Sequence, residues 1–428
     1  GIPMNLLIFF LFSFPKIVRA LASPSTLPTD MKNLFRIRTI TAFVCLTSDD
    51  FDDDEKSSTC LLEEKIRRSS EFLSTVQEKL QSSGYTIQTL RIATNPFGEY
   101  LINNGSSEML DHRLKKIDTI LAKYGIDFFS LGPAKSVDEI RDCCPRIISS
   151  SPRLSCSANV DADDVQAAKA AAECILQIST ASVPEFLQGG LGNFRFCSAT
   201  CCPGTIPFFP SAYSSQQEDS FAVGLENGAM AHALLSKSSS ISNIADTFYE
   251  GMAPALLPIQ QICEEEGRKG SFSFLGIDTS LNPSLDKGGS VADAIETLEE
   301  VRGDFGGPGT LAAAAAITKA IQSLPSIKTT GYCGLMLPVC EDRRLAELTD
   351  MRVTNFLAIS SVCGVGVDTV PISASTDRES LQALLLDVAA LASRWNKPLS
   401  CRVFPVGNAG EMTNFDSPYL CNSRIYSL

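Results

Sequence analysis

Histidine is scarce in this chain, because the 428 residues include only His112 and His232. A metal site or proton relay built from imidazoles is therefore hard to assemble, and acid–base chemistry falls mainly to Cys, Asp, Glu, Lys or Tyr side chains. Basic residues are also in deficit, since 36 Lys and Arg face 49 Asp and Glu, a formal net charge of −13. Such a chain repels phosphate backbones, so we expect no nucleic-acid partner, although a local cationic pocket for a small anion remains compatible with it.

Recognisable cofactor motifs are missing as well. The glycine-rich stretch 306–310 is not followed by Gly-Lys-Ser/Thr, so it is not a Walker A loop, and it does not fit the dinucleotide fingerprint. The adjacent pairs Cys143-Cys144 and Cys201-Cys202 have no second pair at zinc-ribbon spacing. With no nicotinamide, flavin or zinc motif, the cofactor is unknown and we predict no metal ligands.

Fifteen cysteines are many, and their number is odd, which would leave an unpaired thiol in a secreted protein. Most stand in apolar or strand-like segments, where a free thiol behaves as a small hydrophobe. We therefore expect a reducing compartment and a cytoplasmic protein.

The apolar run at residues 6–12 is too short for a comfortable membrane span, so no membrane partner is expected. With the small residues that follow it, this run is similar to a signal peptide, and the secretory pathway is the alternative localisation if residues 1–22 act as one. No positive charge precedes the run. We predict that residues 1–30 are an extension outside the fold and that residues 31–428 form a single domain.

Strand-like and helix-like patterns alternate along most of the chain. Strands are expected at residues 34–46, 85–93 and 332–337, among others, and helices at 61–83 and 219–235, among others. Strands alternating with helices imply parallel βαβ units and the α/β class.

Four short segments place Gly, Pro, Asp or Cys where an α/β protein turns from a strand into a loop or helix. They read FCSATCCPGTIPFFP (196–210), GIDTS (276–280), FGGPGT (305–310) and CGVGVD (363–368). In their order and amino-acid sequence they resemble the UPF0210 family, also called DUF711, and the resemblance extends from about residue 35 to the end of the chain. The resemblance implies a fold like that of the pyruvate formate-lyase, or glycyl-radical enzyme, superfamily: a large α/β barrel with helices outside.

The C-terminal fingerprint of glycyl-radical enzymes is altered here. That fingerprint is Arg-Val-x-Gly-aromatic, whereas the nearest stretch, residues 402–407, has Pro405 in the glycine position and no aromatic residue after Gly407. We therefore expect a non-radical mechanism.

The segment after the strand at 195–199 is rich in proline and aromatic residues. Prolines fix φ and stop a helix or strand from continuing, so Pro207, Phe208, Phe209 and Tyr213 are predicted to form a rigid, substrate-binding pocket rim. The alternative is a packed crossover that only closes the barrel.

A second binding element is predicted at Gly306, Gly309 and Thr310, which open an Ala-rich helix with Thr310 as the N-cap. Free backbone N–H groups at such a helix start bind phosphate or carboxylate well. The alternative is an ordinary capped turn.

Catalytic candidates follow two strand-like segments. Asp278 and Asp368 are expected at strand ends inside the barrel, where a carboxylate can act as a base, bind a hydroxyl group or ligate a metal. The alternative for each is an Asp that stabilises a turn. Cys363 is the most attractive nucleophile, provided that a cation or a helix start lowers the pKa of its thiol.

Arginines in the predicted strands complete the candidate site. Arg38, Arg195 and Arg402 either pair with a carboxylate such as Asp278 or Asp368, or bind an anionic substrate bidentately. We favour substrate binding for Arg38.

These residues predict an enzyme that acts on a small anionic metabolite by lyase, isomerase or cyclase chemistry without a radical. Two alternatives stay open: a metabolite-binding regulatory protein without catalysis, and a specialised-metabolism enzyme recruited from the family. A homo-oligomer is compatible with the sequence.

Overall fold

The computed structural model describes residues 29–51, 60–102 and 109–428, so most of the predicted extension 1–30 lies outside the described residues. A single sheet runs in the order β7-β6-β1-β2-β3-β4-β5-β9-β8. Its strands are β1 (Arg36–Val44), β2 (Ile87–Thr94), β3 (Phe128–Ala134), β4 (Leu154–Asn159), β5 (Phe196–Thr200), β6 (Ser220–Glu226), β7 (Ser273–Asp278), β8 (Gly366–Ile372) and β9 (Leu399–Pro405).

The strands fall into two parallel sets that run in opposite directions. Strands β1 to β5 pair in parallel, each with the next. The pairs β6–β7 and β8–β9 are also parallel, but β6 is antiparallel to β1 and β9 is antiparallel to β5. The α/β class is confirmed, and the sheet is mixed rather than wholly parallel.

The two edges of the sheet meet through one irregular segment. Isolated bridges join Ile277 to Thr329 and Leu281 to Leu335 on the β7 side, and Pro338 to Asp368 on the β8 side. Regular strand pairing therefore does not close the expected barrel in the described part of the chain. The strand predicted at 332–337 is wrong, because left-handed backbone around Cys333, with φ of 45°, interrupts a regular ladder.

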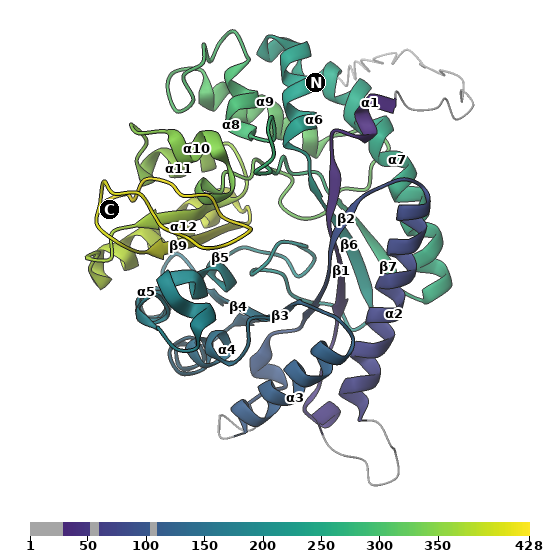
Figure 1. The fold of residues 1–428 in the computed structure, drawn as a ribbon, viewed down its shortest axis with the longest axis vertical. Coiled ribbons are helices and arrows are strands. Elements are labelled where there is room, and N and C mark those ends of the chain that lie inside the picture. The colour runs from purple at the N-terminus through teal and green to yellow at the C-terminus, as the bar shows by residue number, and fades with distance from the viewer. Residues whose placement is uncertain (1–28, 52–59, 103–108) are drawn as a thin grey trace, which may run out of the picture.

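Helices cover the outer face of the sheet (Figure 1). The longer ones are α2 (Leu61–Ser82), α3 (Leu110–Lys123), α5 (Val165–Thr180), α6 (Gly228–Ser238), α7 (Ile244–Gly270), α9 (Thr310–Gln322), α11 (Val353–Ser360) and α12 (Arg378–Trp395). The shorter ones are α1 (Thr29–Lys32), α4 (Cys144–Ser150), α8 (Val291–Glu296) and α10 (Arg343–Glu347). Among the described residues, none of the helices has both the length and the apolar character needed to cross a bilayer.

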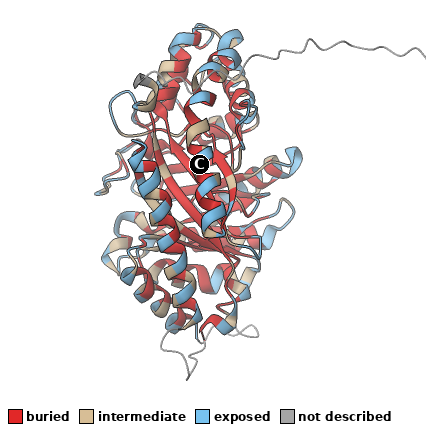
Figure 2. Ribbon diagram, turned by 90° about the vertical axis from the view of Figure 1, so that its right-hand side faces the viewer, coloured by how far each residue is buried: buried red, intermediate tan, exposed pale blue. Residues whose placement is uncertain are grey.

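The main hydrophobic core lies between the sheet and these helices, and the buried strands are surrounded by helices with exposed outer faces (Figure 2). The two faces of strand β1 differ in polarity. Ile37, Ile40 and Ala42 pack outward into the core, whereas Thr39 and Thr41 share the inner face and their hydroxyl oxygens lie 3.0 Å apart. The inner face is thus free to carry polar groups.

Two elements differ from the sequence-based expectation. The helix predicted at 219–235 begins only at Gly228, because residues 220–226 form β6, a strand buried on both faces whose continuous apolar run carries no strand period. Strand β8 was not expected. Gly366 at its start has φ of 104°, and a Cβ there would meet the Ser400 oxygen of β9 at 2.0 Å, so this glycine allows close strand pairing rather than a turn.

Candidate functional site

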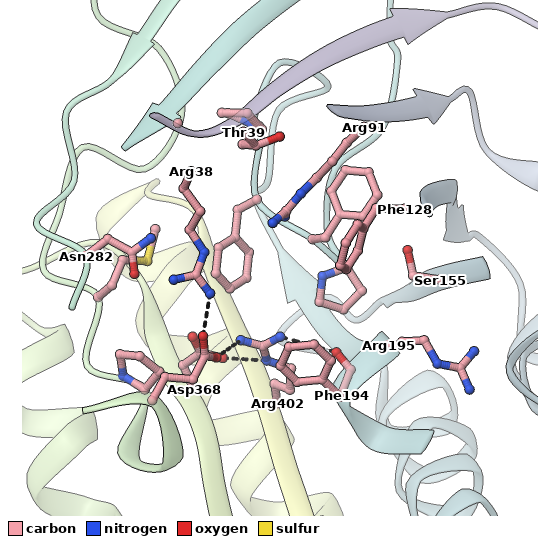
Figure 3. Close-up of a pocket in the computed structure, with 18 of the residues that line it drawn as sticks. Arg38, Thr39, Arg91, Phe128, Ser155, Phe194, Arg195, Asn282, Asp368 and Arg402 are labelled. Carbon is pink, nitrogen blue, oxygen red and sulfur yellow. Dashed lines mark hydrogen bonds and ion pairs between the residues drawn. The ribbon is translucent and has the colours of Figure 1, made fainter. Parts of the chain in front are cut away.

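A cavity of about 70 Å³ lies on the inner face of the sheet. Since one water needs roughly 10–15 Å³ on this measure, the cavity suits a small molecule. Among the residues proposed from the sequence, its lining includes Arg38, Arg195, Pro207, Phe208, Phe209, Asp278, Asp368 and Arg402. Figure 3 shows several of these side chains converging from strands that are far apart in the sequence.

A bulge in β1 directs Arg38 into the cavity. Ile37 faces Leu225 of β6 and Thr39 faces Gly224, so Arg38 is the extra residue of the bulge. A β-bulge places two successive side chains on one face, and accordingly Arg38 and Thr39 both line the cavity.

Arg91 on β2 has neither a carboxylate partner nor, at its two Nη groups, a hydrogen-bond acceptor among the described residues. Its Nε donates to the Thr89 hydroxyl at 2.9 Å, and its guanidinium lies 4.8 Å from the ring centre of Phe128 and 5.2 Å from that of Phe209. No Asp or Glu among the described residues lies within ion-pair distance of it. Burial, together with the nearby Arg38 and Arg402 charges, lowers the pKa of Arg91 to about 9.

Arg402 forms the centre of a buried ionic network. Its Nε donates to Asp368 at 2.7 Å and its Nη2 to Glu341 at 3.0 Å. Glu341 also accepts from Arg38 Nη2 at 2.5 Å, so one carboxylate joins the two arginines. Burial raises the pKa of Asp368, while the Arg402 charge opposes that rise. A buried carboxylate with a raised pKa beside a second carboxylate is a chemically plausible acid–base group.

Asp278 reaches the cavity, but its oxygens are already bonded. Oδ1 accepts from the Ser280 hydroxyl at 2.6 Å, the Ser280 amide at 3.0 Å and the Cys333 amide at 3.1 Å, and Oδ2 accepts from the Tyr332 amide at 3.2 Å. Burial raises the pKa of Asp278, against these hydrogen bonds. The geometry favours the turn-stabilising role that the sequence left open, because this carboxylate holds the segment that joins β7 to β8.

Cys363 and the glycine-rich helix start lie away from the cavity. The Cys363 thiol is buried in the core outside the sheet, where its sulfur accepts from the Leu335 amide at 2.8 Å, and burial raises the pKa of this thiol. A raised pKa is the opposite of what a thiolate nucleophile needs. At α9 the N-cap is Gly309 rather than Thr310, and the Thr310 hydroxyl accepts from the Gly306 amide at 3.0 Å.

The proline-rich segment forms one wall of the cavity through Pro207, Phe208 and Phe209. Phe208 meets Tyr332 edge-on with ring centres 5.4 Å apart. Tyr213 is not part of the lining, because its hydroxyl donates to the Cys202 carbonyl at 3.0 Å behind that wall.

Arg195 borders the cavity with its donors already used. Its two Nη atoms donate to the backbone carbonyls of Ser151, Leu154 and Ile148 at 2.7, 2.8 and 2.9 Å. In Figure 3 its guanidinium lies apart from those of Arg91 and Arg402. Arg195 therefore ties loops together rather than offering donors to a ligand.

Aromatic residues frame the mouth of the cavity. Tyr419 stacks on Phe194 with ring centres 6.1 Å apart and meets Phe128 edge-on at 6.3 Å. Both phenylalanines also line the cavity, and Tyr419 is half exposed. The loop that carries Tyr419 is pinned at its base, where the Thr413 amide donates to the Ser423 carbonyl.

Sequence reasoning missed Arg91 and Glu341. Arg91 lies inside the strand predicted at 85–93, and Arg91 and Thr41 are register partners across β1 and β2. Arg91 is the charged residue of that predicted strand, which was the available signal. Glu341 was assigned to the start of a helix, and no local pattern marks it as the partner of two arginines.

Within the ranges that the structure describes, no group of three or more His, Cys, Asp and Glu side chains is arranged to hold a metal ion.

Comparison with known proteins matches residues 31–417 to the family model described as "Uncharacterised ACR (DUF711)". A UPF0210 protein of Pyrobaculum islandicum is 27% identical over 355 residues, which cover 76% of this chain and 75% of that protein. A UPF0210 protein of Oleidesulfovibrio alaskensis is 24% identical, covering 89% of this chain and 88% of that protein. A solved structure titled anaerobic ribonucleotide reductase aligns with a TM-score of 0.35 and 10% identity, covering 86% of this chain and 70% of that one.

Proposed function

The chain belongs to the DUF711 family, and we propose that it is an enzyme that binds a small anionic metabolite in the central cavity and transforms it by proton transfer, without a radical. The supporting observation is Arg91, a guanidinium that faces the cavity with no carboxylate partner among the described residues. Lyase, isomerase and cyclase reactions all fit such chemistry.

An enclosed cation without a directly paired counter-ion is costly, because burial and the Arg38 and Arg402 charges penalise the charged form and the attraction of Glu341 offsets only part of that penalty. The lowered pKa of Arg91 expresses this cost. A bound anion would supply the missing charge and make bidentate hydrogen bonds to the guanidinium. Arg402, by contrast, already has two carboxylates, so its charge is satisfied without a ligand.

Asp368 is the proposed proton-transfer group. Among the described residues, Arg402 Nε is the donor that contacts its side chain. Burial favours the protonated form and Arg402 favours the ionised form, so neither form of this carboxylate is stabilised by all of its surroundings, which suits a group that gains and releases a proton. Glu341 sits across the same arginine, so a charge change at Asp368 is shared with a second carboxylate.

Untargeted incubation tests this proposal. The purified full chain is mixed with a metabolite extract, and masses are compared before and after, with Asp368→Asn as the matched inactive variant. We expect an anion to be consumed and a product to appear with the native chain alone. An anion that binds in an Arg91-dependent manner without being consumed would instead support the regulatory alternative, which the ion-paired state of Asp368 favours.

A further inference from the structure

We infer, resting on the proposed anion-binding role of the cavity, that its ligand is a small monocarboxylate with an apolar body, rather than a phosphate or a dicarboxylate. The inference comes from the charge balance of the lining, from the number of donors left free in it, and from the apolar character of the remaining wall.

The lining carries one net positive charge. Arg153 is paired with Asp118 outside the cavity, with their nearest atoms 3.1 Å apart, and does not enter the sum. Glu226, 3.6 Å from Arg38, is hydrogen-bonded to Arg36 outside the cavity, and this neutral pair is left out as well. Four arginines then face three carboxylates, so 4 − 3 leaves one positive charge, and a single negative charge on the ligand neutralises it. A doubly charged ligand would leave one buried negative charge uncompensated, which is costly in an enclosed site. The groups counted are Arg38, Arg91, Arg195 and Arg402 against Asp278, Glu341 and Asp368.

The other arginines of the lining already have partners. Arg195 donates to three backbone carbonyls, and Arg402 donates to Asp368, Glu341 and the Phe194 carbonyl. Arg38 donates to Glu341 through Nη2, and its Nη1 lies 3.6 Å from Glu226. Arg91 keeps its two Nη groups unbonded to the described residues, because only its Nε has a partner.

One guanidinium edge matches the two oxygens of one carboxylate. The third terminal oxygen of a phosphate, or the second carboxylate of a diacid, would have to compete with Glu341 and Glu226 for the remaining donors of Arg38. The flanking rings of Phe128 and Phe209 confine Arg91 from two sides. A planar carboxylate aligned with the guanidinium fits between them better than a tetrahedral group.

The rest of the wall offers apolar surface to the ligand body. Phe194, Phe208, Met336 and Pro207 line the cavity beside the two rings. Apolar groups buried against such a wall contribute about 25 cal/mol per Å² of surface removed from water. The cavity of about 70 Å³ has room for a few carbon atoms, and a longer body would extend into the pocket of about 430 Å³ that shares Arg91, Phe128 and Phe194 with it.

Calorimetric titration of the full chain with a matched set of probes tests this inference. The probes are isobutyrate, its neutral analogue isobutyramide, succinate and inorganic phosphate. Since a hydrogen bond to a charged group contributes about 1.5–3 kcal/mol, we expect isobutyrate to bind roughly 10- to 150-fold more tightly than isobutyramide. Succinate and phosphate should bind more weakly than isobutyrate. Arg91→Met should abolish the preference, while Arg67→Met on the outer surface should leave it unchanged.

The possible outcomes distinguish the monocarboxylate inference from the proposed anion-binding function on which it rests. If succinate or phosphate binds more tightly than isobutyrate and Arg91→Met removes that binding, the monocarboxylate inference is overturned while anion binding at Arg91 stands. If isobutyramide binds as tightly as isobutyrate, charge recognition itself is overturned. If no probe binds at millimolar concentration, the inference is overturned, and an unaltered metabolite profile in the extract would overturn the proposed function as well.

Discussion

Replacing Arg91 with methionine should make the protein more stable and at the same time unable to bind its ligand. Most substitutions of a buried residue destabilise a protein. Arg91 is different, because it brings a charge into the cavity without a carboxylate partner among the described residues. Methionine keeps an unbranched apolar stem that can lie between Phe128 and Phe209, and it removes the charge.

The magnitude follows from the perturbed guanidinium. The lowering of the Arg91 pKa from the ordinary guanidinium value to about 9 corresponds to roughly 5 kcal/mol at about 1.36 kcal/mol per unit. The two ring contacts return about 1 kcal/mol each, and partial contact with solvent screens a further part. We therefore expect a net gain of about 2 kcal/mol in the free energy of unfolding. With an unfolding entropy of about 2.1 cal/mol/K per residue, this raises the melting temperature by about 2 °C.

Thermal and chemical denaturation of the ligand-free protein measure this gain. Arg402→Met is the matched control, because it removes an arginine of the same cavity that has two carboxylate partners, Asp368 and Glu341. Breaking a buried ion pair from one side costs about 3–5 kcal/mol, so this control should be markedly less stable than the native chain.

The reasoning about Arg91 would be refuted by a loss of stability comparable to that of Arg402→Met. Such a loss would mean that Arg91 has a structural counter-ion, and the case for an anionic ligand would then lose its main support. A gain in stability with undiminished ligand binding would also contradict the proposal, since binding would not need this charge.

Three further predictions concern the other side chains of the site. Asp278→Asn should lower the free energy of unfolding, measured by denaturant titration, by about 2–4 kcal/mol, because an amide cannot accept all four hydrogen bonds that the carboxylate accepts. An unchanged free energy of unfolding would instead make Asp278 a candidate base again. Burial raises the pKa of Asp278, so the folded state keeps a proton that the unfolded state loses near pH ~3.9. The free energy of unfolding should therefore fall as pH rises through the window just above that value, and Asp278→Asn should remove this fall. Tyr419→Ala should speed both association and dissociation of a bound anion in stopped-flow measurements with little change in stability, because the half-exposed ring packs on Phe128 and Phe194 and lines the pocket that adjoins the cavity. Unchanged rates would exclude a gating role.

Much of the cavity could be predicted because its residues occupy strands or the ends of strands. Arg38 and Arg402 were recognised as charged residues inside apolar strands, and such residues must face either a partner or a ligand. The proline-rich wall was recognisable because three prolines exclude regular structure over a short stretch. Asp368 was found for a partly wrong reason, since it lies within β8 and not after a strand.

The rest depends on long-range geometry. The sequence does not say which of Arg38, Arg91 and Arg402 meets a carboxylate, because Glu341, the partner of Arg38 and Arg402, lies 303 positions from Arg38. Cys363 and Thr310 have suitable local surroundings, yet both lie outside the sheet, and the face a residue takes depends on the register of the strands. The bulge at Arg38 shifts that register by one residue, which no pattern in the sequence marked.

The alternation along β1 has a consequence for protein engineering. Ile37, Ile40 and Ala42 belong to the core that holds the helices, whereas Arg38 and Thr39 face the cavity and lie outside that core. The positions that maintain the scaffold and those that shape the interior are thus interleaved along one strand but separated in space. A library of substitutions confined to the inward-facing positions would change the shape and charge of the cavity. Because these positions lie outside the hydrophobic core, the core would stay intact, and the fold is therefore a suitable starting point for designing proteins that bind other ligands.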